Sequence, residues 1–292
     1  MKESLTLALS SLGVFAAFSV HALFAERLSD ARYDGRRFSF PSTQLLLGYA
    51  LVLPLAVLAR HLAKDRAPPP LTHPRVLMAA AASVVSLECA LRMSQRLSYL
   101  FQTLFRSSKF LSLTLAAFLT GGPASRRDVG LAALSALGLG LFLAGGSAQK
   151  SGRGTAAGVG LGVLSLLADC GVAQAQRGLR APSFLALLLA SNTWNALFAL
   201  GLSAARRELQ PALHFLIAHP AAARDQLLAA LSFALGTFCI FFHLQRFGPL
   251  SLAYVTSVRK VCTILASCLL FGHRVRGWRA VGIAIIVACI AA

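Results

Sequence analysis

Ten apolar stretches, separated by charged, proline or glycine residues, occupy most of this sequence of 292 residues. Each is close to the ~20 residues that an α-helix needs to cross ~30 Å of hydrocarbon. Backbone polar groups inside lipid must be satisfied within the chain, and these stretches lack the polar–apolar alternation of barrel strands. We therefore predict an all-α membrane protein with ten transmembrane helices. They lie at Leu5–Phe24, Thr43–Leu58, Val76–Leu91, Tyr99–Thr120, Val129–Gly146, Thr155–Ala175, Ser183–Ala204, Gln226–Leu244, Leu250–Phe271 and Trp278–Ala292.

The composition excludes a sizeable soluble domain, because 57% of the residues are hydrophobic, 13% are charged and the mean hydropathy is +0.69. The net charge of +18 would suggest a nucleic-acid partner in a soluble protein. Here the basic residues form short clusters between apolar stretches, such as Arg36-Arg37 and Arg126-Arg127, as is typical of loops at lipid headgroups. We therefore expect a lipid bilayer and no nucleic acid as a partner.

The first apolar stretch follows a single early lysine, Lys2, and Val20-x-Ala22 loosely resembles a signal-peptide cleavage site. The stretch is longer than a typical signal core and the rest of the chain is equally apolar, so we interpret it as the first spanning helix. The two longest connections, Glu26–Ser42 and Arg206–Arg224, are too short to fold separately. We therefore predict one integrated transmembrane domain.

The fourth and ninth stretches resemble each other around Lys109 and Lys260. Each lysine follows an arginine by one to three residues and precedes a glycine by twelve, and the two lysines are 151 residues apart, about half the chain. Five spans per half is an odd number, so a duplicated half would insert in the opposite sense. We predict two inverted five-helix repeats, at residues 1–150 and 151–292.

Lys109 and Lys260 lie about ten residues from either end of their predicted helices, or roughly 15 Å from the nearest interface. A lysine side chain reaches about 6 Å, too short to snorkel easily. One interpretation is purely structural, with each lysine paired to a buried carboxylate, Glu88 or Asp169. We favour an anion that visits a water-filled cavity, because the basic residues of these two stretches outnumber the two acids. These basic residues are Arg106, Lys109, Arg259 and Lys260.

Hydroxyl side chains flank both lysines and suit phosphate oxygens. Arginine binds phosphate bidentately and lysine binds it as a point charge. Phosphate is favoured over carboxylate by the number of positive charges, so the residues alone predict a transporter of an organic anion. We interpret His243 and His273, near span ends, as loop or interfacial histidines rather than proton relays. The flanking hydroxyls belong to Thr103, Ser107, Ser108, Tyr254, Thr256 and Ser257.

At these residues the chain resembles the nucleotide-sugar transporters of the drug/metabolite transporter superfamily. The branch is that of UDP-galactose, UDP-N-acetylglucosamine and adenosine phosphosulfate carriers. The ninth stretch is similar to the family signature F-G-P-L…T-x-x-R-K…T-I-L-x-S…F-G through Phe247–Leu250, Thr256–Lys260, Thr263–Ser267 and Phe271–His273. Weaker matches are Glu88–Leu91, Ser107–Lys109, Asp169 with Gln176 seven residues later, and Asn192.

The resemblance implies a multi-pass protein of the Golgi or endoplasmic reticulum membrane that works as an antiporter by alternating access. Its expected cargo is a UDP-sugar such as UDP-galactose, exchanged for a nucleoside monophosphate, with no enzymatic activity, cofactor or metal. The sequence shows no lysine-rich cytosolic tail after Ala292, which leaves retention in the endoplasmic reticulum open and suggests truncation. Alternatives are an adenosine 3'-phosphate 5'-phosphosulfate or ATP/ADP exchanger and, from another class, a non-transporting membrane scaffold. A homodimer is one candidate assembly.

The resemblance also implies roles for individual residues. Those that would hold phosphates are Lys109, Arg259 and Lys260. Those that would line the nucleotide or sugar are Tyr254, Thr256, Gln176 and Asn192. A structural or gating role is assigned to Glu88, Asp169 and Arg106, of which Arg106 is an extra charge unusual for the family.

Overall fold

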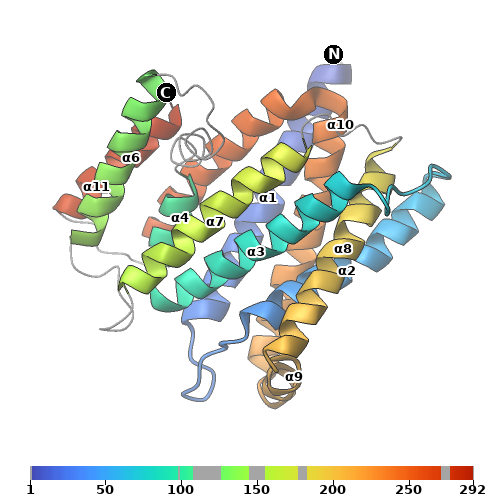
Figure 1. Cartoon of the computed structure of the whole chain (residues 1–292), viewed down its shortest axis with the longest axis horizontal. Helices are drawn as coiled ribbons and strands as arrows, with labels where there is room; N and C mark the ends of the chain where they lie inside the picture. The colour runs from blue at the N-terminus through green and yellow to red at the C-terminus, as the bar shows by residue number, and fades with distance from the viewer. Residues whose placement is uncertain are drawn as a thin grey trace. The chain divides into compact units, whose positions relative to one another are not determined.

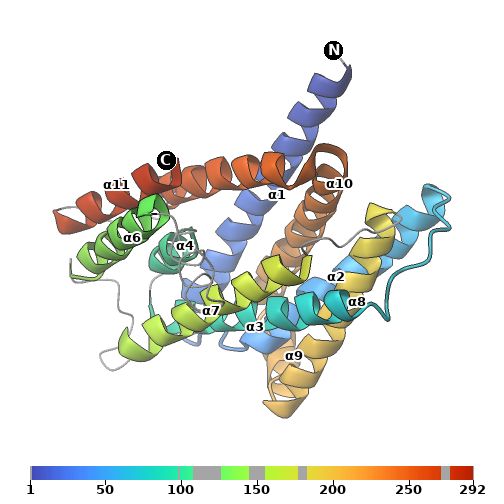
Figure 2. The same cartoon turned by 45° about the horizontal axis from the view of Figure 1, so that its top comes forward.

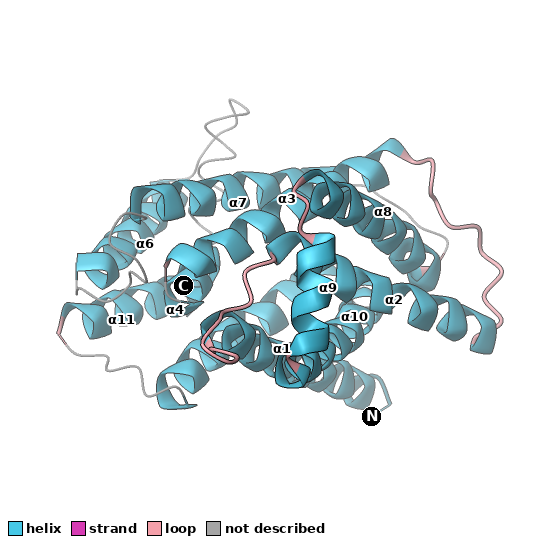
Figure 3. Ribbon diagram, turned by 90° about the horizontal axis from the view of Figure 1, so that it is seen from below, coloured by secondary structure: helices cyan, strands magenta, loops and turns pink. Residues whose placement is uncertain are grey.

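The computed structural model describes residues 2–97, 99–107, 126–144, 155–176, 183–270 and 277–291. Within these ranges the chain forms ten helices joined by loops (Figures 1 and 3), and an isolated bridge joins Tyr33 and Arg36. The helices are α1 (Lys2–Asp30), α2 (Pro41–Leu62), α3 (Pro74–Arg96), α4 (Tyr99–Ser107), α6 (Arg126–Ala144), α7 (Thr155–Gln176), α8 (Phe184–Ala205), α9 (Leu209–Ala218), α10 (Pro220–Leu270) and α11 (Trp278–Ala291).

Five of the described helical segments are long and apolar enough to cross a membrane. They are Glu3–Asp30, Pro41–Leu62, Pro74–Arg96, Phe184–Ala205 and Pro220–Phe247. Shorter apolar helices lie at Val129–Phe142, Ala156–Val172, Leu209–Ala218 and Ala280–Cys289. The chain is therefore an all-α, multi-pass membrane protein, as the sequence predicts, while ten spans in two inverted repeats stay a prediction.

The helices form two compact units. Unit 1 comprises Met1–Val84 and Val172–Arg259, and unit 2 comprises Val85–Gly171 and Lys260–Ala292. Each unit joins segments from both halves of the chain, and the division into repeats at residue 150 stays a prediction.

In unit 1, α2 and α8 pack against each other in opposite directions. Near the start of α2 and the end of α8, the hydroxyls of Thr43 and Ser203 are 2.7 Å apart, and Ser42 N–H donates to Glu208 Oε2 at 3.0 Å. Between the helix ends, small and branched side chains form an apolar contact that also includes α10. Its buried members are Val52, Ala56, Leu188 and Ala234. Because membrane helices gain little from apolar contact alone, such polar links fix how the two helices pair.

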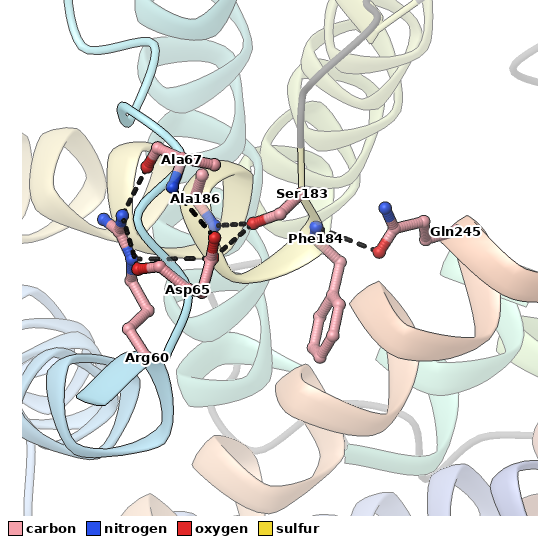
Figure 4. Close-up of polar contacts among 7 residues, drawn as sticks. All are labelled: Arg60, Asp65, Ala67, Ser183, Phe184, Ala186 and Gln245. Atoms are coloured by element: carbon pink, nitrogen blue, oxygen red, sulfur yellow. Dashed lines mark hydrogen bonds and ion pairs between the residues drawn. The ribbon is translucent and has the colours of Figure 1, made fainter. Parts of the chain in front are cut away.

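At the opposite end of this pair, the loop after α2 folds around Asp65 (Figure 4). Asp65 Oδ1 accepts from Ala67 N–H at 3.0 Å, and Oδ2 lies 3.6 Å from Arg60 Nε. Arg60 also donates to the backbone carbonyls of Asp65 and Ala67. The loop is thus closed by its own charged residues where α2 ends.

The same carboxylate connects the loop to the start of α8. Ser183 Oγ donates to Asp65 Oδ2 at 2.5 Å and accepts from Ala186 N–H at 3.0 Å, so Ser183 is the N-cap of α8. Phe184 N–H donates to Gln245 of α10 at 3.0 Å (Figure 4). The Ser183 hydroxyl above all, then the Ala67 N–H and the Arg60 guanidinium, lower the pKa of Asp65 from its usual value.

In unit 2, α6 and α11 lie side by side (Figures 1 and 2). Glycines of α7 provide a second close contact, with α3 and α4. A Cβ on Gly158 would lie 2.8 Å from Leu97 Cγ, and one on Gly162 would lie 2.8 Å from both Met93 Sδ and Phe105 Cε1. Glycine at these two positions therefore lets α7 approach its neighbours closely.

Helix α9, in the predicted connection Arg206–Arg224, and helix α10 both differ from the helices that the sequence predicts. Within the connection, α9 forms with Pro211 in its first turn, and α10 begins at Pro220, both positions that tolerate proline. The predicted eighth span, Gln226–Leu244, lies within the candidate span Pro220–Phe247. It is not a helix separate from the ninth, because helical structure continues from Pro220 to Leu270 in α10. Pro249 lies inside α10, where a proline bends a helix without having to end it.

Candidate functional site

The signature residues from Phe247 to Ser267 belong to one helix, α10, while Phe271–His273 lie outside the described residues. Arg259 and Thr256 are three positions apart in α10, so they lie on the same side of it, and both side chains are partly buried. Tyr254 and Lys260 also belong to α10, although their side chains lie outside the described part of the chain. Lys109 lies entirely outside the described residues.

Arg259 contacts the aromatic ring of Phe18 in α1. Its guanidinium carbon Cζ lies 5.1 Å from the centre of that ring. This separation is within the ~6 Å at which the π-electrons of a phenyl ring attract a cation. An arginine remains charged in proteins, so α1 presents a stabilising surface to a permanent positive charge.

The Phe18 ring is partly buried and packs against side chains and backbone of α1 and α10. A Cβ on Gly236 would lie 2.6 Å from Phe18 Cε2, so only glycine leaves room for the ring there. Phe233 and His21 make edge contacts with it at centroid distances of 6.3 and 6.2 Å. His21 Nδ1 lies 2.9 Å from the carbonyl oxygen of Ala229, and since a carbonyl only accepts, this nitrogen is the donor.

In unit 2, Asp169 of α7 pairs with Arg106 of α4, with 3.4 Å between Oδ2 and Nη2. Ser86 Oγ of α3 donates to Asp169 Oδ1 at 2.5 Å, and Ser165 Oγ donates to the Ser86 carbonyl at 2.9 Å. The Asp169 and Arg106 side chains are 36% and 27% exposed, so the pair joins three helices without being sealed from its surroundings.

Glu88 of α3 is 4% exposed, and its Oε1 accepts from Arg92 Nε at 2.5 Å, one helical turn further on. The predicted third span ends at Leu91, so Arg92 is not among the site residues that the sequence predicts. The helix runs to Arg96 instead, which brings Arg92 onto the same helix face as Glu88. Arginines thus contact both acids that were considered as lysine partners, and Arg92 adds a fifth basic residue to the four counted from the sequence.

The two amides assigned to the nucleotide or sugar belong to unit 1. Asn192 of α8 is 2% exposed, and its Nδ2 donates to the Leu188 carbonyl of its own helix at 2.8 Å. Gln176 ends α7, and its side chain lies outside the described part. Unit 1 therefore holds these amides together with Arg259 and Thr256.

His243 is fully buried near the end of the candidate span Pro220–Phe247, and its interfacial position stays a prediction. Its Nδ1 lies 2.9 Å from Ser10 Oγ and its Nε2 lies 2.9 Å from Ser251 Oγ. Ser10 Oγ donates its hydrogen to the Leu7 carbonyl, so it accepts from His243 Nδ1–H. The signal in the sequence was a lone histidine in an apolar stretch, which satisfies its ring nitrogens with hydroxyls of neighbouring segments.

Residues 6–292 match the UAA transporter family. The Drosophila melanogaster "Solute carrier family 35 member B1 homolog" is 38% identical over 93 residues, which are 32% of this chain and 28% of that protein. The Kluyveromyces lactis "UDP-galactose transporter homolog 1" is 34% identical over 93 residues, 32% of this chain and 27% of that protein.

The Dictyostelium discoideum protein "Solute carrier family 35 member B1" is similar at 33% identity over 93 residues, 32% of this chain and 24% of that protein. The chain thus spans about a quarter of the length of these relatives in each match. The family and these relatives are transporters, not enzymes. Because the family match extends over nearly the whole sequence, the resemblance to nucleotide-sugar transporters is confirmed, and the chain belongs to the UAA transporter family.

Proposed function

We propose that this protein is an antiporter that exchanges a UDP-sugar, such as UDP-galactose, for a nucleoside monophosphate across a Golgi or endoplasmic reticulum membrane. The observation that carries the proposal is the family match over residues 6–292, which includes the partly buried Arg259 of α10. The name of the Kluyveromyces lactis relative supports a UDP-sugar as the cargo.

In this proposal, Arg259, Lys260 and Lys109 bind the phosphates. Arginine can donate two parallel hydrogen bonds to one phosphate, while each lysine adds a compact charge. The residues proposed to line the nucleotide or sugar are Tyr254, Thr256, Gln176 and Asn192. Glu88, Asp169 and Arg106 have a structural or gating role, since the two acids contact arginines in unit 2.

The charge of the site explains why transport would be an exchange. Basic side chains inside a bilayer are costly unless an anion or water compensates them. A site loaded with phosphate can pass through a closed intermediate of alternating access at much lower cost than an empty site. Net movement in one direction would require the empty site to reorient, so the bound sugar nucleotide is exchanged for a monophosphate instead.

A thermal-shift screen of the purified protein against UDP, GDP, CMP and adenosine nucleotides tests this proposal first. We expect UDP and UMP to raise the melting temperature more than the others. A preference for ATP, ADP or adenosine 3'-phosphate 5'-phosphosulfate would identify one of the adenine-nucleotide exchangers instead. A melting temperature that no nucleotide shifts would favour a non-transporting scaffold and contradict the proposal.

A further inference from the structure

We infer that Phe18 is a positioning residue that fixes the direction of the Arg259 guanidinium for phosphate binding. The inference rests on the proposed function, because it assumes that Arg259 binds the phosphates of the cargo. It goes further in assigning a specific role to a phenylalanine of α1 that the signature of the ninth stretch does not include. The contacts that carry it all lie within unit 1.

One ring contacts two distant points of the same helix. Gly236 and Arg259 both belong to α10, and in a straight α-helix residues 23 positions apart would be separated by about 35 Å. The Phe18 ring nevertheless touches the backbone at Gly236 and lies under the Arg259 guanidinium. The helix must therefore turn back between these residues, and Pro249 lies in that interval. Figure 2 shows the bend of the α10 ribbon.

The ring thus lies at the inside of the α10 bend, where α1 and α10 both contact it. Gly236 supports it from one side, while Phe233 and His21 contact its edges. A phenylalanine has two side-chain torsions, so packing of this kind leaves it few alternatives. A ring fixed at the bend can therefore determine the direction of the flexible Arg259 side chain, which extends from the part of α10 that follows the bend.

The chemistry of the contact suits a residue that must also bind an anion. A cation–π contact uses the π-electrons of the ring and not the hydrogen-bond donors of the guanidinium, so it can coexist with donation to phosphate. Holding the side chain in one direction before the anion arrives also lowers the entropy that binding would otherwise cost. Phe18 would thereby raise phosphate affinity without touching the phosphate itself.

The test is a double-mutant cycle on UDP binding, measured with radiolabelled UDP on the purified full-length protein in nanodiscs. We expect Phe18→Leu to weaken UDP binding about 3- to 30-fold, and Phe18→Tyr, which keeps the aromatic face, to stay within about threefold of wild type. Arg259→Gln should weaken binding more. Adding Phe18→Leu to Arg259→Gln should cause no further loss, because the phenylalanine acts through the arginine.

Gly236→Ala is a second way to disturb the contact between Phe18 and Arg259, because its new methyl group would push the Phe18 ring aside. It should reduce affinity as Phe18→Leu does, and it keeps the test available if Phe18→Leu does not fold. The matched control is Gly201→Ala in α8, where a Cβ would meet nothing within 4 Å and affinity should not change.

The outcomes separate the inference from the proposed function. Wild-type protein that does not bind UDP would overturn the proposed function, and Arg259→Gln with wild-type affinity would overturn the role of Arg259. If Arg259→Gln weakens binding but Phe18→Leu does not, the positioning role alone is overturned. Equal losses from Phe18→Leu in both backgrounds would likewise show that Phe18 contributes only to packing.

Discussion

Gly138 of α6 and Gly282 of α11 face each other so closely that neither position can accept a methyl group. A Cβ on Gly282 would lie 2.5 Å from the carbonyl oxygen of Gly138, and one on Gly138 would lie 2.9 Å from that of Gly282. Because the neighbour is backbone rather than a flexible side chain, it cannot move aside locally. The close packing of α11 against α6 in unit 2 therefore requires glycine at both positions.

Gly282→Ala should destabilise the protein by about 1–3 kcal/mol, because the added methyl group forces α6 and α11 apart. The matched control is Gly140→Ala, since Gly140 belongs to the same helix as Gly138 but has nothing within 4 Å of a new Cβ. It should be neutral or stabilising by up to about 1 kcal/mol, because alanine is the better helix former. Thermal unfolding in detergent measures both, and equal melting temperatures for the two variants would contradict the close contact.

The Arg106–Asp169 pair should show energetic coupling. Asp169→Asn and Arg106→Gln are each expected to lower stability by about 1 kcal/mol, a modest value because both side chains are partly exposed. Their double variant should lose less than the two single losses combined. Arg126→Gln, an exposed arginine of α6, serves as a control. Strict additivity of the two single effects in thermal unfolding would show that the pair contributes nothing.

The lowered pKa of Asp65 predicts that the folded protein loses stability in acid. Its pKa is lowered in the folded protein, so its contribution is present above the unfolded value near 3.9 and is lost as the pH falls through the folded value. Asp65→Asn should therefore lower the melting temperature at pH 7. The difference from wild type should shrink progressively as the pH falls below about 4. A constant difference from pH 7 to pH 3 would rule out the ionised carboxylate as the cause.

Ser183 links this carboxylate to a helix start, which gives a separate prediction at neutral pH. Ser183→Ala removes both the N-cap of α8 and the hydroxyl that donates to Asp65. We expect a loss of about 0.5–2 kcal/mol in the free energy of unfolding. Ser183→Thr retains a hydroxyl and should recover most of that loss. If Ser183→Ala melts like wild type, the loop and α8 are not connected in the way that the contacts suggest.

The sequence predicted most helices because their apolar length is a strong local signal. Ser183–Ala204, for example, corresponds closely to α8, and Leu5–Phe24 lies within the longer α1. It did less well where proline or charge was read as a boundary. The proline at position 249 predicts a boundary before Leu250, yet a proline can bend a helix without ending it, and α10 continues through Pro249.

The polar contacts were less predictable, because they join residues far apart in sequence. Thr43 and Ser203 are 160 positions apart, and helices that are apolar on all sides carry no periodicity that shows which neighbour they face. The contact of Arg259 with Phe18 depends on the bend of α10 in the same way. Glu88 with Arg92 is the exception, since their spacing of four was visible once the helix was extended past Leu91.

The most direct test of the proposed exchange is UDP-galactose uptake into proteoliposomes loaded with UMP. The account predicts saturable uptake that depends on internal UMP and is abolished by Lys260→Gln in protein that still folds and inserts. Lys64→Gln, at an exposed lysine of the loop after α2, should transport like wild type. The proposed exchange would be contradicted by uptake no faster than in protein-free liposomes. It would also be contradicted if the Lys260→Gln variant exchanged at the wild-type rate.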